Sequence, residues 1–531
     1  MRVTTVAALG ILVVGSVAAV VWKYTAPVLE QRAKIQTSDA ARLKGTVQIG
    51  VDNFIGYWLL CSPQQRTLMR NDGYDQKCVD DEADYAGRFQ KLKEGKLQFA
   101  VATVDSYELN ALTSQYPGLM VTVIDRSTGA DAAVACNDKV KNIDDLKRGG
   151  LKIAFAVGTP SEHLLKVVGA RFDISQWREA DKSWRIETKS SAEAAKKCQG
   201  GEADVAVMWE PDITKTLKRN PKASKLIGTD FSPYTIIDVL IVRSEFATRN
   251  PEVVTKLLKN YFLTLSHYRQ NPGEAVDDAL AYVNANATAE TRLTQDDVKS
   301  AMKGVTWINL AENATLWFGI AEPEPGTLPK FALIDVIEST AKILTDSGDF
   351  TPGHRPPDDA GLMVQSRFVK DLYETGLASG EKVDAKDADS LSREFSELTE
   401  DQWKSNFREL GTLRVRPVNF PSGTDTLSVE ARENVDHIAE AIRSFPKARI
   451  VIEGHTSTRG DSQENLLLSQ DRAEAVARYL QVTFRVSPNR IRAVGYGGSK
   501  AKEVVQTREE SNREYLGRLP RVVVKLVMES Y

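Results

Sequence analysis

Residues 449–476 read RIVIEGHTSTRGDSQENLLLSQDRAEAV, and this stretch decides the fold of the C-terminal part of the chain. Its first seven residues, RIVIEGH, are rich in β-branched side chains and predict a strand. Ala473, Val476 and Leu480 then recur at helical spacing, which predicts a helix from about Ser469 to Gln481. A strand followed by a helix is the building unit of an α/β fold.

The flanking sequence continues the same pattern. Ala431, Val435, Ile438 and Ile442 share one face of a helix that we expect from Ser428 to Phe445. Three further strands are predicted in the runs RVRPVNF (414–420), RIRAVGYG (490–497) and RVVVKLVM (521–528). The residues LTEDQWKSNFREL (398–410) favour a helix. We therefore expect a separate α/β module over residues 412–531.

A short set of residues in this module matches a known signature. The set is Gly454-His455-Thr456, Gly460, Asn465 and the run Leu468-Ser469-x-x-Arg472-Ala473-x-x-Val476. It resembles the OmpA-like peptidoglycan-binding domain of outer-membrane porins, peptidoglycan-associated lipoproteins and flagellar stator B subunits. The resemblance implies a βαβαβ-type fold of helices on a sheet, which binds the meso-diaminopimelate of the peptide stem without catalysis.

The resemblance also implies a peptidoglycan site made of Thr456, Ser457, Asp461, Asn465 and Arg472. Arg472 matches the carboxylate-binding arginine, because a guanidinium can donate two parallel bonds to one carboxylate. Amides at a helix N-terminus add a favourable dipole. The site predicts binding to the carboxylates and the ammonium group of the peptide stem.

Two positions depart from the family pattern. The family usually has Asp after the His-Thr pair, where Ser457 stands, and a hydroxyl gives up a charge-assisted bond worth about 1.5–3 kcal/mol. Asp461, four residues on, is a candidate to take its place. The family's Asn-Arg-Arg motif before the last strand is also incomplete here. Asn512-Arg513 lies too early in the sequence, and Leu519-Pro520-Arg521 stands directly before the last predicted strand. The alternative is a degenerate fold that serves as a partner-docking module.

Residues 46–345 show a second α/β pattern. Helical stretches separate six short apolar runs: VQIGV (47–51), FAVATV (99–104), LMVTVI (119–124), LKIAFAV (151–157), ADVAVMW (203–209) and TIIDVLIV (235–242). Strands alternating with helices predict a fold rich in parallel strands. Residues 250–345 are expected to be mainly helical.

Several of these stretches resemble a group of periplasmic solute-binding proteins of ABC transporters. They include VQIGVDNFIGYW (47–58), VATVDSYELNAL (101–112), KNIDDLKRGGLKIAFAVGTPSEHLLKVV (141–168) and GEADVAVMWEPDITKTL (201–217). The group serves nitrate, sulfonate, taurine and thiamine precursors. The resemblance implies two lobes joined by hinge strands, with the solute in the cleft between them.

Candidate cleft residues follow strands or precede helices, because open α/β sheets bind ligands at those ends. They are Asn53, Tyr57, Ser106, Thr128, Thr159, Ser161, Trp209, Glu210 and Asp238. Some have a second interpretation, since Ser and Thr commonly cap helices, Thr128 lies in a turn sequence, and tryptophan is often a core residue. Glu210 and Asp238 are costly to bury unless they are paired. If both face the cleft, a cationic or amine ligand fits better than nitrate or sulfonate.

The N-terminus contains a stretch of membrane-spanning length. Val3 to Trp22 carries no charged residue, and a helix of about 20 residues crosses the hydrocarbon layer. Arg2 and Lys23 flank it and favour a cytoplasmic N-terminus. The alternative is a cleaved signal peptide ending near Tyr24-Thr25-Ala26. Both interpretations export the remaining chain, and the first predicts a single-pass inner-membrane protein with its bulk in the periplasm.

Composition limits the other classes of function. The chain has 531 residues and a net charge of −3, so two or three domains are expected and nucleic acid is not a predicted partner. Its four cysteines form no CxxC pair, which disfavours zinc, and no cofactor is predicted. Cys61 and Cys78 either close a loop as a disulfide or remain free thiols. No GxSxG, HExxH or P-loop motif indicates an enzyme.

These observations divide the chain into five segments: an anchor (1–23), a stalk (24–45), a solute-binding module (46–345), a connector (346–411) and the C-terminal module (412–531). We expect a membrane-tethered periplasmic protein that binds peptidoglycan and an unidentified small solute. Such a protein serves solute sensing or uptake, or envelope organisation. An ABC permease or another inner-membrane complex is the expected partner. The alternative is a scaffold between inner membrane and cell wall with a vestigial cleft.

Overall fold

The structure is a computed structural model. It describes residues 43–174, 177, 181–285, 287–289, 291–322, 333–383, 391, 393–506 and 510–529. The predicted membrane span and most of the predicted stalk lie outside this part of the chain. Within the part described, no helix combines the length and the apolar character that a membrane span requires.

The first lobe is built on a six-stranded sheet with strand order β11-β4-β10-β3-β1-β2. The strands are β1 (Gly45–Val51), β2 (Tyr74–Asp80), β3 (Phe99–Thr103), β4 (Gly118–Ser127), β10 (Ile237–Arg243) and β11 (Val305–Trp307). β1 pairs in parallel with β2 and β3, while β10 runs antiparallel to both β3 and β4. Four of the apolar runs noted in the sequence fall in these strands.

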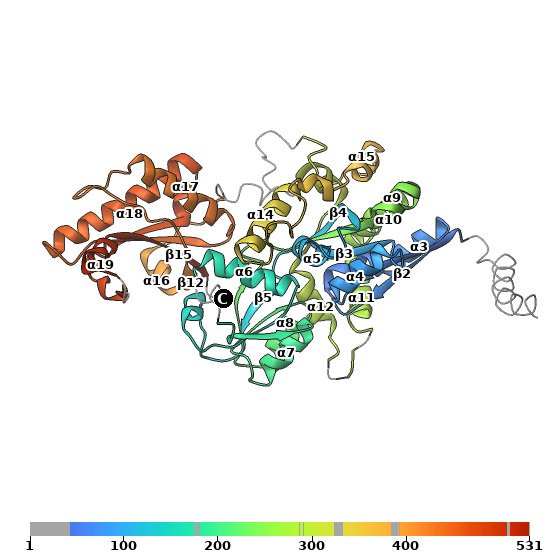
Figure 1. The fold of residues 1–531 in the computed structure, drawn as a ribbon, viewed down its shortest axis with the longest axis horizontal. Helices are drawn as coiled ribbons and strands as arrows, with labels where there is room; N and C mark the ends of the chain where they lie inside the picture. Colours follow the sequence, from blue (N-terminus) through green and yellow to red (C-terminus); the bar gives the residue numbers. More distant parts are fainter. Residues whose placement is uncertain are drawn as a thin grey trace, which may run out of the picture.

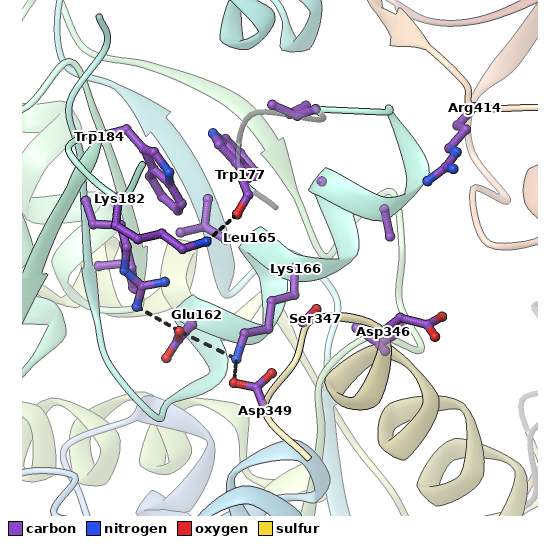
Figure 2. A pocket seen from close by; sticks show the side chains of 16 residues that line it. Glu162, Leu165, Lys166, Trp177, Lys182, Trp184, Asp346, Ser347, Asp349 and Arg414 are labelled. Atoms are coloured by element: carbon purple, nitrogen blue, oxygen red, sulfur yellow. Dashed lines mark hydrogen bonds and ion pairs between the residues drawn. The ribbon is translucent and has the colours of Figure 1, made fainter. Parts of the chain in front are cut away.

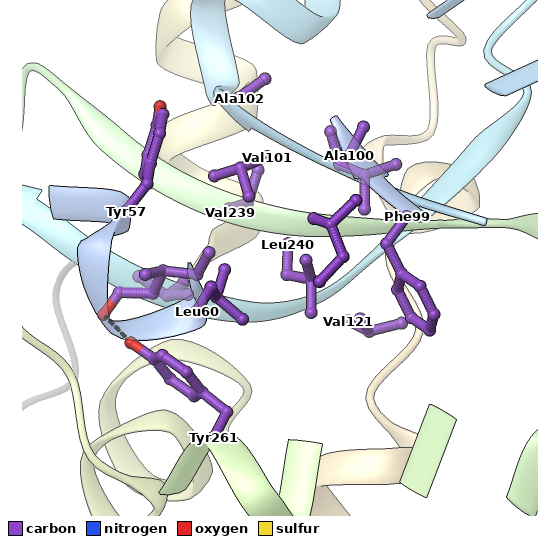
Figure 3. Close-up of a cluster of buried hydrophobic side chains, with 14 of the residues drawn as sticks. Tyr57, Leu60, Phe99, Ala100, Val101, Ala102, Val121, Val239, Leu240 and Tyr261 are labelled. Carbon is purple, nitrogen blue, oxygen red and sulfur yellow. Dashed lines mark hydrogen bonds between the residues drawn. The ribbon is translucent and has the colours of Figure 1, made fainter. Parts of the chain in front are cut away.

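Helices cover both faces of this sheet (Figure 1). Their apolar sides enclose a core that includes Leu60, Phe99, Val239 and Tyr261 (Figure 3). The buried Tyr261 hydroxyl donates to the backbone oxygen of Ile124 at 3.1 Å. The helices are α2 (Trp58–Cys61), α3 (Pro63–Asn71), α4 (Tyr85–Lys93), α5 (Val104–Asn110), α9 (Ser244–Arg249), α10 (Pro251–Gln270), α11 (Pro272–Val283), α12 (Gln295–Met302), α13 (Leu310–Glu312) and α15 (Arg367–Glu374).

The second lobe is a five-stranded sheet with strand order β7-β6-β8-β5-β9. Its strands are β5 (Asp131–Ala135), β6 (Ile153–Ala156), β7 (Arg185–Thr188), β8 (Val205–Trp209) and β9 (Ser224–Gly228). Three helices pack on it: α6 (Pro160–Arg171), α7 (Ser191–Gln199) and α8 (Asp212–Arg219). The chain enters this lobe from β4 and returns through β10, so two adjacent crossings join the lobes as hinges.

Two disulfides fasten the lobes internally. Cys61–Cys78 links α2 to β2 in the first lobe, with Cα atoms 5.9 Å apart. Cys136–Cys198 ties the end of β5 to α7 in the second lobe. The sequence left the first bridge open and gave no indication of the second, because its partners are 62 residues apart.

The C-terminal module has a four-stranded mixed sheet with strand order β12-β15-β13-β14. β13 and β14 are parallel, and β15 runs antiparallel to both β12 and β13. Helices α17 and α18 pack together and cover one face of this sheet (Figure 1). The elements are α16 (Glu400–Ser405), β12 (Phe407–Thr412), α17 (Val429–Arg443), β13 (Arg449–His455), α18 (Ser462–Phe484), β14 (Ile491–Gly495), α19 (Asn512–Arg518) and β15 (Arg521–Glu529).

The start of this module differs from the sequence prediction. The predicted strand at 414–420 is wrong, because the edge strand is β12 and the chain leaves the sheet after Thr412. Pro417 has no backbone N–H to donate to a sheet, which suits the irregular path that follows. The predicted helix at 398–410 is only the short α16, whose Thr399–Gln402 capping box fixes its first turn.

The C-terminal module packs directly against the second lobe, and their apolar side chains form one continuous core. Phe172 and Phe445 meet edge to face with ring centroids 5.7 Å apart. The Arg414 amide donates to the Arg171 backbone oxygen at 2.7 Å. Helix α14 (Leu333–Asp346) lies against both α5 and α6 and so contacts both lobes.

Candidate functional sites

A small cavity lies between the two lobes, where the strand ends of both sheets meet. It is lined by Asp52, Phe54, Tyr57, Tyr85, Thr103, Asp131, Pro160, Trp209, Ile236 and Asp238. The cavity measures about 10 Å³, which is room for one water molecule. The lobes are therefore closed on each other.

Contacts at the rim hold the lobes together. The Asn110 side chain of α5 donates to the Gly158 backbone oxygen of the second lobe at 2.7 Å. On the other side, Lys218 of α8 pairs with Asp297 of α12 at 3.0 Å. The Trp209 indole N–H reaches the Asn53 side-chain oxygen at 3.5 Å. The closed state thus has polar contacts around the cavity.

Asp238, which lines the cavity, belongs to a pair of facing carboxyl groups. Asp238 of β10 stands opposite Asp125 of β4 in the antiparallel pair. The Tyr57 hydroxyl donates to Asp238 Oδ1 at 2.5 Å, and the side chains of Asp125 and Asp238 are hydrogen-bonded to each other. The Asp125 oxygens and Asp238 Oδ2 have no other donor among the described residues. Burial raises the pKa of Asp125 to about 8. Burial and the Asp125 charge together raise the pKa of Asp238 well above its ordinary value, so the pair retains a proton at neutral pH.

Asp131 supplies a carboxylate from the opposite lobe. It begins β5, is only 2% exposed, and its Oδ2 has no hydrogen-bond partner in the described part of the chain. Burial raises the pKa of Asp131 to about 7, and the charges of Asp105 and Glu210 act in the same direction. The second lobe thus presents a fully buried acid to the cavity.

Asp52, the third carboxylate of the cavity, is already paired. Its Oδ2 contacts Arg88 Nη2 at 3.0 Å and accepts from the Tyr85 hydroxyl at 3.2 Å. Arg88 is fully buried and also binds Asp81. One guanidinium therefore neutralises part of the charge of two carboxylates, and it forms no ion pair with Asp131 or Asp238.

The structure brings some predicted solute residues together and gives others local roles. Tyr57, Trp209 and Asp238 line the cavity, and Asn53 contacts Trp209. Thr159 caps α6 by accepting from the Ser161 amide at 3.3 Å. Ser161 is completely buried and its hydroxyl lacks a partner within the described residues.

The remaining predicted residues, Ser106, Thr128 and Glu210, do not line the cavity. Ser106 hydrogen-bonds the Thr103 hydroxyl at 2.8 Å. Thr128 contacts the Thr306 hydroxyl at 3.0 Å. Glu210 accepts from the amide and hydroxyl of Thr214 at 3.1 and 2.9 Å, and burial raises its pKa to about 7.

Sequence reasoning missed Asp52, Phe54, Tyr85 and Asp131 as cavity residues. Asp52 directly follows β1 and Asp131 begins β5, so both occupy strand ends of the kind that marked the other candidates. Tyr85 gave no such signal, because it begins a helix and reaches the cavity only through the packing of α4.

A larger cavity of about 230 Å³ lies where the second lobe, α14 and the C-terminal module meet (Figure 2). Trp177 and Trp184 stack in its wall with centroids 5.4 Å apart. Its charged groups are largely paired with one another: Glu162 binds Arg185 at 2.9 Å, and Lys166 binds Asp349 at 2.8 Å. This cavity consequently has fewer unpaired charged groups for a ligand to bind than the cleft.

In the C-terminal module, Arg472 projects from α18 toward the loop that follows β12. Its Nε donates to the Thr424 backbone oxygen at 2.9 Å and its Nη2 to that of Pro421 at 3.2 Å. Its guanidinium lies 5.1 Å from the Phe420 ring centroid. The side chain is thus held in place by the loop, and burial lowers its pKa.

The other predicted peptidoglycan residues surround the N-terminus of α18. Asp461 is the N-cap, with Oδ1 accepting from the amides of Gln463 and Glu464. Asn465 donates to the Arg459 backbone oxygen at 2.7 Å. Thr456 is buried with its amide bonded to Gly497. Ser457 accepts from the Arg459 amide at 3.3 Å, so a hydroxyl stands where the family usually has a carboxylate.

Residues 419–515 match the model of the OmpA family, which confirms the OmpA-like character expected for this module. A peptidoglycan-associated lipoprotein of Legionella pneumophila is 37% identical over 78 residues, which cover 15% of this chain and 44% of that protein. The same-named protein of Buchnera aphidicola subsp. Baizongia pistaciae is 29% identical over 108 residues, covering 20% and 61%. The chain thus spans about half the length of the curated relatives it matches.

The first part of the chain is similar to solved structures of solute-binding proteins. One is the alkanesulfonate-binding protein of Xanthomonas axonopodis pv. citri bound to MOPS, with 15% identity and a TM-score of 0.44. The match covers 61% of this chain and 99% of that one. For the chain itself, the two-lobed interpretation rests on the two sheets and the paired crossings between them.

Proposed function

We propose that this chain is a cell-envelope protein that binds peptidoglycan with its C-terminal module and a small solute in the interlobe cleft. The peptidoglycan part is supported by the family match and by Arg472, which the loop after β12 holds in a fixed position. The solute part is supported by the closed cavity, where the buried Oδ2 of Asp131 finds no protein partner among the described residues. This second observation carries the proposal, because buried polar groups without partners are rare in folded proteins.

We further propose that the chain is exported and held in the inner membrane by residues 3–22. The two disulfides support export, since disulfides persist in oxidising compartments. A protein fixed to both membrane and wall is a poor shuttle, so sensing or envelope organisation fits better than delivery by diffusion. An ABC permease or another inner-membrane complex would then receive the solute or the signal. We propose binding and not catalysis as the activity of both sites.

A sacculus pull-down tests the wall-binding half. Full-length chain in detergent is incubated with purified diaminopimelate-type sacculi, and the pelleted fraction is compared for wild type, Arg472→Ala and Arg478→Ala. Arg478 lies on the exposed side of the same helix and serves as the matched control. We expect Arg472→Ala to lose retention and Arg478→Ala to keep it. Equal retention of all three would show that Arg472 is not the anchor.

A thermal-shift screen tests the solute half. The full-length chain is heated with small amines, small anions and pyrimidines, and a ligand of the cleft raises the unfolding temperature by mass action. The scaffold alternative is favoured by one observation, the small volume of the cleft. It predicts no shift with any of these compounds.

A further inference from the structure

The charges that surround the cavity indicate which kind of solute it can bind. Three of its ten lining residues are aspartates, and no lining residue is a lysine, arginine or histidine. Arg88, the buried cation next to the cavity, is shared by Asp52 and Asp81. Asp131 and Asp238 therefore face the cavity without an ion-pair partner among the described residues, since Lys225, whose charge reaches Asp131, pairs with Asp230. An anionic solute would meet like charges at short range.

The free oxygens of these two aspartates come from opposite lobes. Asp131 begins β5 of the second lobe and Asp238 lies in β10 of the first. Both residues are fully buried. Oδ2 of Asp131 lacks a donor in the described part of the chain, and Oδ2 of Asp238 has none there besides the proton that it shares with Asp125. A solute with at least two N–H groups would supply both donors at once and would link the lobes in the closed state.

Aromatic rings form much of the remaining wall: Phe54, Tyr57, Tyr85 and Trp209. The negative face of an aromatic ring attracts a cation, most strongly where water is excluded. The Phe54 and Tyr57 rings meet edge to face with centroids 5.2 Å apart, and Asp238 fixes the Tyr57 hydroxyl. Rings in these positions favour an organic ammonium group over a metal ion, which would take further oxygen ligands.

The volume of the cavity limits the size of the solute group inside it, because about 10 Å³ accommodates only a very small group while the lobes are closed. Resting on the proposed solute-binding function and narrowing it, we propose that the cleft binds a small primary ammonium compound. Its ammonium group, about the size of one water molecule, occupies the closed cavity and donates N–H groups to Asp131 and Asp238, and the surrounding rings enclose its charge.

Isothermal titration of the full-length chain tests this inference with four probes: methylammonium, tetramethylammonium, methanesulfonate and Ca²⁺. We expect binding of methylammonium, and much weaker binding of tetramethylammonium because it has no N–H to donate. Methanesulfonate binding without methylammonium binding would overturn the inference and leave the solute-binding function standing. Preferred binding of Ca²⁺, or equal binding of both ammonium probes, would also overturn it. No binding of any probe would overturn the inference, and the wider solute screen would then decide the function.

Variants locate the binding in the cleft. Asp238→Asn and Asp131→Asn each remove one charge-assisted bond and should weaken methylammonium binding roughly 10- to 150-fold. Glu108→Gln is the matched control, since Glu108 is a fully buried carboxylate without a described partner that does not line the cavity. We expect this control to bind as wild type does. Unchanged affinity in both folded aspartate variants would contradict the proposed contacts.

Discussion

The two candidate sites differ in how far the protein itself satisfies their charged groups. In the cleft, Asp131 has a buried oxygen that no donor in the described residues reaches, and Asp238 faces a second carboxyl group. In the C-terminal module, Arg472 already donates to two backbone oxygens and lies over a ring. A buried acceptor without a partner costs free energy until a ligand arrives, whereas a hydrogen-bonded guanidinium is positioned in advance. We therefore expect the unliganded cleft to lower the stability of the fold, and the unliganded Arg472 to lower it little.

The largest expected effect concerns the pH dependence of stability at the cleft. Burial raises the pKa of Asp131 to about 7, with Asp105 and Glu210 adding to the rise and Lys225 opposing it. An acid whose pKa is higher in the folded state stabilises the fold while it is protonated, and this contribution is lost as pH rises toward 7. The free energy of unfolding of wild type should therefore fall relative to that of Asp131→Asn, by about 3 kcal/mol between pH 5 and pH 8.

Urea unfolding followed by tryptophan fluorescence at both pH values measures this difference. Asp296→Asn, at a 92% exposed side chain, is the control and should follow wild type. The same pH dependence in wild type and Asp131→Asn would mean that Asp131 is not strained by its burial.

Ser457→Asp should bring the wall site closer to the family pattern. A carboxylate at this position can pair with the ammonium of the peptide stem, and a charge-assisted bond contributes about 1.5–3 kcal/mol. Affinity for sacculi should rise accordingly, as measured by co-sedimentation at several protein concentrations. Thr458→Asp places the same charge on the exposed neighbouring residue and should leave the affinity unchanged. A loss of affinity in Ser457→Asp would indicate that the module recognises a different ligand.

Phe420→Ala tests whether the wall site is positioned in advance. The Phe420 ring supports the Arg472 guanidinium, and such a contact contributes about 0.5–2 kcal/mol. We expect weaker retention on sacculi than for wild type, although stronger than for Arg472→Ala. Phe420→Leu keeps apolar bulk without the ring and should be intermediate. Full retention in Phe420→Ala would show that the backbone bonds alone position Arg472.

The smallest expected effect is at the rim of the cleft. Lys218 and Asp297 pair across the lobes, but Lys218 is 60% exposed, and such surface pairs contribute about 0.2–1 kcal/mol. Lys218→Ala should weaken methylammonium binding only a few-fold, because closure depends mainly on the buried aspartates. Lys299→Ala breaks a pair within α12 and should have no effect on titration. A large loss of methylammonium affinity in Lys218→Ala would show that closure of the lobes depends mainly on the rim contacts and not on the buried aspartates.

The sequence predicted the local elements better than the contacts between them. The run VQIGV lies in β1, RIVIEGH forms β13 as expected, and the helix from Ser428 begins with that residue as its cap. The edge strand β12 was missed, since its place in the sheet depends on pairing with β15, more than a hundred residues away. Similarly, α18 begins at Ser462, well before the predicted start, because Asp461 caps it.

The cleft was predictable only in part for the same reason. Asp238 was recognised as a carboxylate that is costly to bury, but its neighbour Asp125 comes beside it only through the antiparallel pairing of β10 with β4. Asp131 depends on the closure of one lobe over the other. At the wall site, Arg472 and Ser457 came from a local motif, whereas the backbone oxygens of Pro421 and Thr424 that hold Arg472 lie in a loop just beyond the stretch 414–420 that the sequence predicted as a strand.

Co-sedimentation of labelled methylammonium with sacculi tests both sites of one chain in a single measurement. Wild-type full-length protein should carry the label into the pellet. Asp238→Asn should pellet without label, and Arg472→Ala should leave both protein and label in the supernatant. Label that pellets with Asp238→Asn, or protein that pellets undiminished with Arg472→Ala, would contradict the account of a solute cleft and a wall anchor on the same chain.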